Sequence, residues 1–146
     1  MFLEEIFPTP IWGFDLDVDV DSIKYWCYSC MKENPGRVIS NVGGWQSEDY
    51  REFGNTPLAE LVLYIVKESH NIANDIGIPK GDRWIENLWI NINPKYSYNQ
   101  VHVHPEARLS GVFYVSAPEN SGDICFTRPN GYSLGTVAPN STRYSS

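Results

Sequence analysis

The chain has 146 residues, of which 42% are hydrophobic and 20% charged, values that suit one globular domain with a real core. Its net charge of −7 at pH 7 argues against non-specific binding to nucleic acid or to an anionic membrane surface. No apolar run approaches the roughly 20 residues that span a bilayer, and the first residues do not resemble a secretory signal. We therefore expect a cytoplasmic protein with neither nucleic-acid nor membrane partners.

Two amphipathic helices are predicted in the first half of the chain. The first begins at Asp21 and is stopped by Pro35-Gly36. The second begins at Thr56 as the N-cap, with Pro57 at the first helical position, and ends at Gly77. Apolar residues recur at helical spacing in both segments. They are Ile23, Trp26, Cys27, Cys30 and Met31 in the first, and Leu58, Leu61, Val62, Ile65, Ile72 and Ile76 in the second.

Three cysteines are an odd number, which does not suggest a disulfide framework. Cys27 and Cys30 form a CxxC on the apolar side of the first helix, and Cys125 lies in a strand-like segment. We expect all three to be core residues. A redox or zinc role for the CxxC is the alternative.

The pattern changes to β beyond Gly81. Strands are predicted at Trp84–Asn93, 101–104, Leu109–Ser116 and Asp123–Thr127, with turns at PENSG and RPNGY. The sequence thus predicts a mainly β, α+β fold, a sandwich or jelly roll with two helices packed outside it. The tail after RPNG is polar and has neither period. Because a jelly roll needs about eight strands, we expect residues 1–146 to form a single domain whose C-terminal part of the barrel is missing.

The stretch NQVHVHPEARLSGVFYV contains two of the three histidines of the chain. In an extended strand, residues i and i+2 share a face, so His102 and His104 should stand side by side. Two imidazoles that converge suit a transition metal such as iron, zinc or copper. A pair of surface histidines on a half-exposed strand is the alternative. His70 lies on the second helix and is predicted to be a surface histidine.

Three blocks of the sequence resemble a known family when taken together. They are FPTPIW, SNVGGWQS at Ser40–Ser47, and WININPKYSYNQVHVHPEARLSGVFYVSAPENSGDICFTRP at Trp89–Pro129. In order and spacing these blocks are similar to small Fe(II)- and 2-oxoglutarate-dependent oxygenases of bacteria and phages, including phages of marine cyanobacteria. The resemblance implies a double-stranded β-helix fold, a form of jelly roll, with Fe(II) as cofactor and 2-oxoglutarate as cosubstrate.

The resemblance also implies roles for four residues. Oxygenases of this class hold Fe(II) with an H-x-[D/E]…H triad; His102 matches the first histidine, and His104 falls where the carboxylate usually stands. Both are therefore candidate metal ligands and catalytic residues. Asn93 and Tyr114 match positions whose side chains reach the bound 2-oxoglutarate. The distal histidine and the following Arg of the family have no match, so we expect the chain to be truncated relative to a working enzyme.

The function implied by the resemblance is hydroxylase-type oxygenation, with a small molecule or a peptide side chain as substrate. In such enzymes 2-oxoglutarate is decarboxylated to succinate while the substrate is oxidised. One alternative is a non-catalytic interaction or structural module on the same scaffold. A cupin-like metal-binding protein is another, although Tyr96, Arg108 and Leu109 occupy the places of its motif glycine and glutamate. Open sheet edges further suggest a homo-oligomer.

Overall fold

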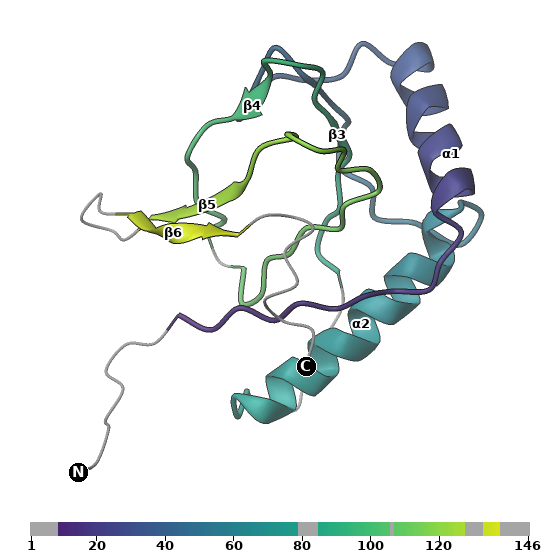
Figure 1. The fold of residues 1–146 in the computed structure, drawn as a ribbon. Coiled ribbons are helices and arrows are strands. Elements are labelled where there is room, and N and C mark those ends of the chain that lie inside the picture. Colours follow the sequence, from purple (N-terminus) through teal and green to yellow (C-terminus); the bar gives the residue numbers. More distant parts are fainter. Residues whose placement is uncertain (1–8, 79–84, 106, 128–132, 138–146) are drawn as a thin grey trace.

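The computed structural model describes residues 9–78, 85–105, 107–127 and 133–137 (Figure 1). Within these residues two helices lie on one side of three small antiparallel sheets, so the α+β part of the predicted fold is confirmed. Each sheet has two strands, pairing β1 with β4, β2 with β3 and β5 with β6. The elements are α1 (Val20–Glu33), β1 (Asn41–Val42), β2 (Trp45–Gln46), α2 (Leu58–Asp75), β3 (Asn91–Ile92), β4 (Tyr98–Asn99), β5 (Ile124–Thr127) and β6 (Ser133–Val137).

Both helices form where the sequence predicts them. The carboxylate of Asp19 caps α1 by accepting hydrogen bonds from the amide of Ser22 at 3.0 Å and from its hydroxyl at 2.6 Å. These bonds favour the charged carboxylate and lower the pKa of Asp19. The hydroxyl of Thr56 accepts from the amide of Leu58 at 3.2 Å, although α2 begins one residue later than predicted. Gly77, with φ of +71°, follows its end.

The buried core joins the two helices to the segment that leads into β3. Ile23 and Cys27 of α1, Leu58 and Leu61 of α2, and Ile90 form one buried cluster. Aromatic and aliphatic side chains from the rest of the chain surround this cluster. They include Trp26, Trp45, Tyr50, Phe53, Leu88, Ile92, Phe113 and Val115.

The three cysteines are free, and they divide between the core and the surface. Burial, with a smaller effect of the neighbouring Cys30, raises the pKa of the Cys27 thiol to about 11. A thiol with so high a pKa is a poor nucleophile near neutral pH, which favours the packing role over a redox role. The prediction that Cys125 is a core residue is wrong, because Ile124 and Phe126 are the partly buried residues of β5 and Cys125 alternates with them to the exposed side.

Residues 41–50 and 88–99 run antiparallel to each other and form a long two-stranded ribbon. It contains the β1–β4 and β2–β3 pairs, with Asn41 opposite Asn99 and Trp45 opposite Ile92. Below β2 the amide of Ser47 donates to the carbonyl of Ile90 at 3.0 Å. The ribbon therefore joins two segments that are separated by all of α2.

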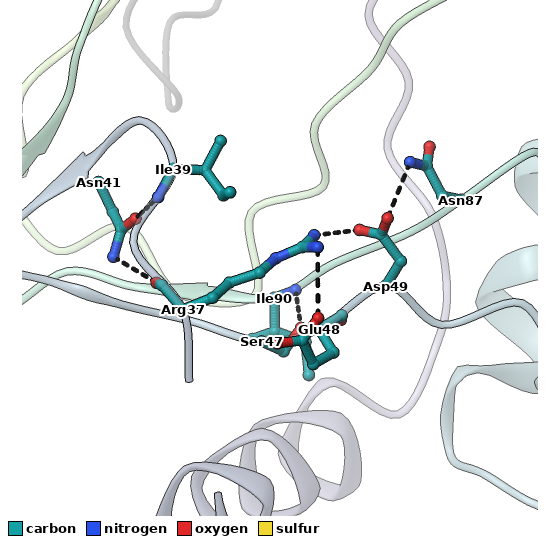
Figure 2. A network of polar contacts seen from close by, with 8 residues as sticks. All are labelled: Arg37, Ile39, Asn41, Ser47, Glu48, Asp49, Asn87 and Ile90. Carbon is teal, nitrogen blue, oxygen red and sulfur yellow. Dashed lines mark hydrogen bonds and ion pairs between the residues drawn. The ribbon is translucent and has the colours of Figure 1, made fainter. Parts of the chain in front are cut away.

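The SNVGGWQS block forms one strand of this ribbon and is held by buried polar groups. The side chain of Asn41 donates to the carbonyls of Arg37 and Gly44 and accepts from the amide of Ile39 at 2.9 Å, so it fixes the turn before β2 (Figure 2). Ser47 is 2% exposed, and its hydroxyl oxygen accepts from the amide of Ile90 at 2.9 Å. The buried side chains of Asn41 and Ser47 therefore stabilise the turn before β2 and the pairing of the two ribbon strands.

An ion-pair cluster lies beside the ribbon on the same strand. The guanidinium of Arg37 contacts the carboxylates of Glu48 and Asp49 (Figure 2). The carboxylate of Asp49 also accepts a hydrogen bond from the side-chain amide of Asn87 at 3.3 Å. Arg37 and Asp49 are mostly buried, whereas Glu48 is exposed. The cluster therefore joins the turn after α1 to both strands of the ribbon.

The strand predictions in the second half are only partly correct. β5 lies within the predicted Asp123–Thr127 strand, and the preceding turn is closed by the amide of Ser121 on the carbonyl of Pro118 at 3.1 Å. In Trp84–Asn93 only β3 and a bridge at Leu88 are regular, and residue 84 lies outside the described part. Leu109–Ser116 alternates in burial only from residue 112 onward, and it has no strand partner among the described residues.

The prediction that the tail has no regular structure is wrong for residues 133–137. These residues form β6, which pairs antiparallel with β5, including Cys125 opposite Thr136. A strand with no apolar alternation of its own can form here because its partner supplies the hydrogen bonds. The predicted RPNGY turn is residues 128–132, which lie outside the described residues. Within the described residues, neither α1 nor α2 is long and apolar enough to cross a membrane.

Replacing Ser47 with Ala should destabilise the protein by about 1–3 kcal/mol, because the buried amide of Ile90 loses its acceptor. Urea unfolding followed by tryptophan fluorescence would measure the loss. Ser116→Ala is the matched control, since Ser116 is exposed and should change stability by less than about 0.5 kcal/mol. Equal stability of the two variants would contradict the role assigned to Ser47.

Candidate metal centre

The two histidines of the HxH motif, His102 and His104, come shortly after the end of the ribbon at Asn99. The amide of Gln100 donates to the carbonyl of Ser40 at 2.7 Å, which anchors the chain two residues before His102. The predicted strand over residues 101–104 is wrong, because β4 ends at Asn99. The amide of Ala107 then donates to the carbonyl of His104 at 3.3 Å, so the chain turns just after the motif. Valines 101 and 103 are exposed, as is His102, while His104 is partly buried.

The rings of His102 and His104 approach one another. Their centroids are 4.9 Å apart, with an angle of 51° between the ring planes. Their Nε2 atoms are separated by 3.0 Å. The two Nε2 atoms thus face each other at hydrogen-bond distance.

The opposite nitrogen of each ring is held by a different oxygen. Nδ1 of His102 is 2.7 Å from the backbone carbonyl oxygen of Gln100, and Nδ1 of His104 contacts the hydroxyl of Ser110. A carbonyl oxygen only accepts, so Nδ1 of His102 carries the proton and its Nε2 keeps a lone pair. This is the pattern of metal-binding histidines, whose second nitrogen is fixed by a carbonyl, carboxylate or similar group.

Trp89 supports His104 from the ribbon side. The two rings meet edge to face, with centroids 5.3 Å apart and an interplanar angle of 89°. Partial burial lowers the pKa of His104, and the neighbouring His102 lowers it further. Both effects favour the neutral imidazole, which is the form that binds a metal.

The spacing of the Nε2 atoms fits two neighbouring ligands of one ion. Two nitrogens about 2.1 Å from a metal and about 90° apart lie about 3.0 Å from each other, while a tetrahedral pair lies about 3.4 Å apart. The separation of 3.0 Å between His102 and His104 is close to the first arrangement and is also that of a direct hydrogen bond between the two nitrogens. Adjacent ligands at about 90° are those of the facial set that non-haem Fe(II) oxygenases use. The residues present therefore fit Fe(II) as two of its ligands.

No third ligand joins them in the part of the chain that the structure describes. There, no group of three or more His, Cys, Asp or Glu residues is placed to hold a metal ion. In the sequence, no histidine follows His104. The third histidine, His70, is partly buried on α2.

Asn93 lies in the segment between β3 and β4, and its side chain is hydrogen-bonded to another asparagine. Its amide donates to the side chain of Asn99 at 2.9 Å, and Asn99 in turn donates to the hydroxyl of Ser40 at 3.1 Å. A Cβ on Gly44 would lie 2.0 Å from the Asn93 oxygen, so the second glycine of GGWQS makes room for this side chain. Asn93 also borders an open groove of about 510 Å³, together with Tyr28 and other residues.

Tyr114 lies in the extended segment after the motif and is 41% exposed. Partial burial raises the pKa of its phenol, and the negative charge of Asp123 raises it further. The phenol therefore stays protonated and can donate a hydrogen bond at neutral pH. Neither Tyr114 nor Asn93 has a hydrogen bond or ring contact with the imidazoles in the described structure.

Three groups of the site are missing from the sequence-based prediction. They are the hydroxyl of Ser110, the carbonyl of Gln100 and the ring of Trp89. A backbone carbonyl has no signature in a sequence, and Ser110 meets His104 only because the chain turns between them. Trp89 belongs to the WININP block, but the sequence does not show that its ring contacts His104.

Comparison with known proteins supports the same chemistry. Residues 87–145, less than half of the chain, match the model of a family described as "Putative 2OG-Fe(II) oxygenase". The resemblance seen in the sequence is therefore confirmed over this segment, which contains Asn93, His102, His104 and Tyr114. The FPTPIW and SNVGGWQS blocks lie outside it. No curated protein and no solved structure matches the chain significantly.

His104 in the metal-free protein should titrate below its ordinary pKa of 6.5. Because the unfolded chain then binds more protons than the folded one, the stability contributed by neutral His104 is present above about pH 6.5 and is lost as the pH falls through its lowered folded pKa. NMR titration of the imidazole carbon-bound protons would measure this. In His102→Ala the pKa should recover only in part, since burial is the larger cause. A midpoint at or above 6.5 in the unmodified chain would contradict the packing described.

Proposed function

We propose that this chain is an Fe(II)- and 2-oxoglutarate-dependent oxygenase of the hydroxylase type, with the double-stranded β-helix fold of that class. The observation that carries the proposal is the facing pair of Nε2 atoms on His102 and His104, 3.0 Å apart, inside the segment that matches the oxygenase family. The third ligand of the facial set is not among the described residues, and its identity stays a prediction.

In this proposal His102 and His104 would bind Fe(II) through Nε2. When bound, the iron and 2-oxoglutarate supply the oxidative chemistry, in which dioxygen is consumed and succinate and CO₂ are released. The carbonyl of Gln100 orients the first ring, and Trp89 limits the movement of the second and shields it from water. The protein thereby contributes geometry and exclusion of solvent.

Tyr114 and Asn93 are proposed to bind 2-oxoglutarate. The neutral phenol of Tyr114 is a suitable donor to a carboxylate, and its raised pKa keeps it in that form. One proton of the Asn93 amide is used by Asn99, so its second proton would serve the cosubstrate. The substrate is proposed to be a small molecule or a peptide side chain. Pairing of two copies through open sheet edges and a cytoplasmic location remain predictions.

Removing one imidazole should abolish tight metal binding without unfolding the protein. We expect His102→Ala and His104→Ala each to lose Co²⁺ or anaerobic Fe²⁺ binding, measured by calorimetry and by the visible spectrum of Co²⁺. His70→Ala is the matched control and should bind metal normally. His102 is exposed, so its variant should keep a cooperative unfolding transition. Metal binding that survives in both single variants would refute this site.

Tyr114→Phe should weaken 2-oxoglutarate binding to the Co²⁺-loaded protein while metal affinity stays unchanged, because only the hydroxyl that would reach the carboxylate is removed. Loss of one hydrogen bond to a charged group costs about 1.5–3 kcal/mol, or roughly 10–150-fold in affinity. Equal affinities would exclude Tyr114 from the cosubstrate site. Succinate release with Fe²⁺ and candidate substrates then tests turnover; metal binding with no 2-oxoglutarate binding would instead favour a non-catalytic metal-binding module.

A further inference from the structure

The hydroxyl of Ser110 is hydrogen-bonded to Nδ1 of His104, the ring nitrogen that does not face His102. Ser110 is six residues beyond His104, and the turn closed by the amide of Ala107 brings it back to the ring. Its side chain is exposed and makes no other hydrogen bond in the described structure. Ser110 therefore does not fill the core, and its hydrogen bond to His104 is what distinguishes it from other surface serines.

The hydrogen bonds of the metal-free pair have a single direction when both rings are neutral. The Gln100 carbonyl accepts from Nδ1 of His102, so Nε2 of His102 can only accept. The 3.0 Å contact between the rings then requires that Nε2 of His104 carries the proton and donates it. Nδ1 of His104 is left with a lone pair, and Ser110 must donate to it. Each group thus donates to the next one, Ser110 to His104, His104 to His102, and His102 to the Gln100 carbonyl, which only accepts.

A metal ion bound by both Nε2 atoms changes the role of one ring only. His102 already has the required tautomer, because its proton is on Nδ1. His104 must move its proton from Nε2 to Nδ1, and its outer partner must then accept instead of donate. A hydroxyl can do both, whereas a carbonyl can only accept and an ammonium can only donate.

We propose that Ser110 is the positioning residue of His104, donating to its Nδ1 in the metal-free protein and accepting from it when a metal is bound. The inference rests on the proposed metal site. It goes beyond that site by assigning the two imidazoles unequal parts, with His102 fixed in its metal-binding tautomer and His104 exchanging between two. Because the hydroxyl can donate or accept, His104 can keep the same ring orientation in the metal-free and the metal-bound protein.

The first test reads the tautomers directly by ¹⁵N NMR of the imidazoles in the metal-free protein above pH 7.5. In the unmodified chain, His102 should carry its proton on Nδ1 and His104 on Nε2. In Ser110→Ala, the contact with His102 should keep the His104 proton on Nε2, whereas the ¹⁵N signal of its Nδ1 should shift because that atom loses its hydrogen-bond donor. Ser110→Thr retains the hydroxyl and should preserve the pattern, and Ser116→Ala is the control for loss of an exposed serine.

The second test uses Co²⁺ alone as the probe, with zinc as a diamagnetic substitute for NMR. Ser110→Ala should bind Co²⁺ about 10-fold more weakly, in the lower range found for lost outer partners of metal-binding histidines. Ser110→Thr should recover most of the affinity, and Ser116→Ala should match the unmodified chain. In the Zn²⁺-loaded protein the His104 proton should be on Nδ1.

The outcomes separate this inference from the proposed function. If His104 carries its proton on Nδ1 in the metal-free protein, or if Ser110→Ala leaves the ¹⁵N signal of His104 Nδ1 and the Co²⁺ affinity unchanged, the role of Ser110 is wrong even when the oxygenase proposal holds. If the unmodified chain binds no metal, the oxygenase proposal and the metal-bound half of this inference both fail. Tight Co²⁺ binding with no 2-oxoglutarate turnover would reject the enzyme and retain the positioning role.

Discussion

The fold depends on one buried interaction, the pairing of Ser47 with Ile90 across the ribbon. Ser47 bonds both the carbonyl and the amide of Ile90, and Ile90 is itself part of the core formed with α1 and α2. The same ribbon continues through β3 and β4 to Gln100, whose amide is held by Ser40 and whose carbonyl orients His102. The position of the first imidazole is therefore set by contacts that reach back, through Ser40, to the segment before α2.

The helices were predictable because their signals are local. Thr56 before α2, Gly77 after it, and apolar residues at helical spacing in both helices act within a few positions of one another. The cap of α1 is Asp19, two residues before the predicted start at Asp21. The ribbon was not predictable, since strands of two residues such as β1 and β4 are too short to show a period. Their pairing depends on partners far along the chain. β6 shows the same limit, because its residues form a strand only against β5.

The candidate site could be predicted in part. The spacing of His102 and His104 identified two side chains whose rings do come together, although they do so on an irregular segment and not on the expected strand. The family resemblance located the segment that matches the oxygenase family. Ser110 and Trp89 needed coordinates, since each reaches His104 through a turn or a neighbouring strand and neither has a characteristic spacing. The GGWQS block, by contrast, proved to be structural, with Gly44 making room for Asn93.

The long separation between the two ribbon strands has a kinetic consequence. The Ser47–Ile90 bond joins residues 43 apart in sequence, and the Asn99–Ser40 bond joins residues 59 apart. Closing such loops costs chain entropy before any contact is gained, so non-local pairing forms slowly, while α2 can form from local contacts alone. The imidazole pair lies at the far end of the late-forming ribbon. Its geometry thus forms late in folding, after the helices.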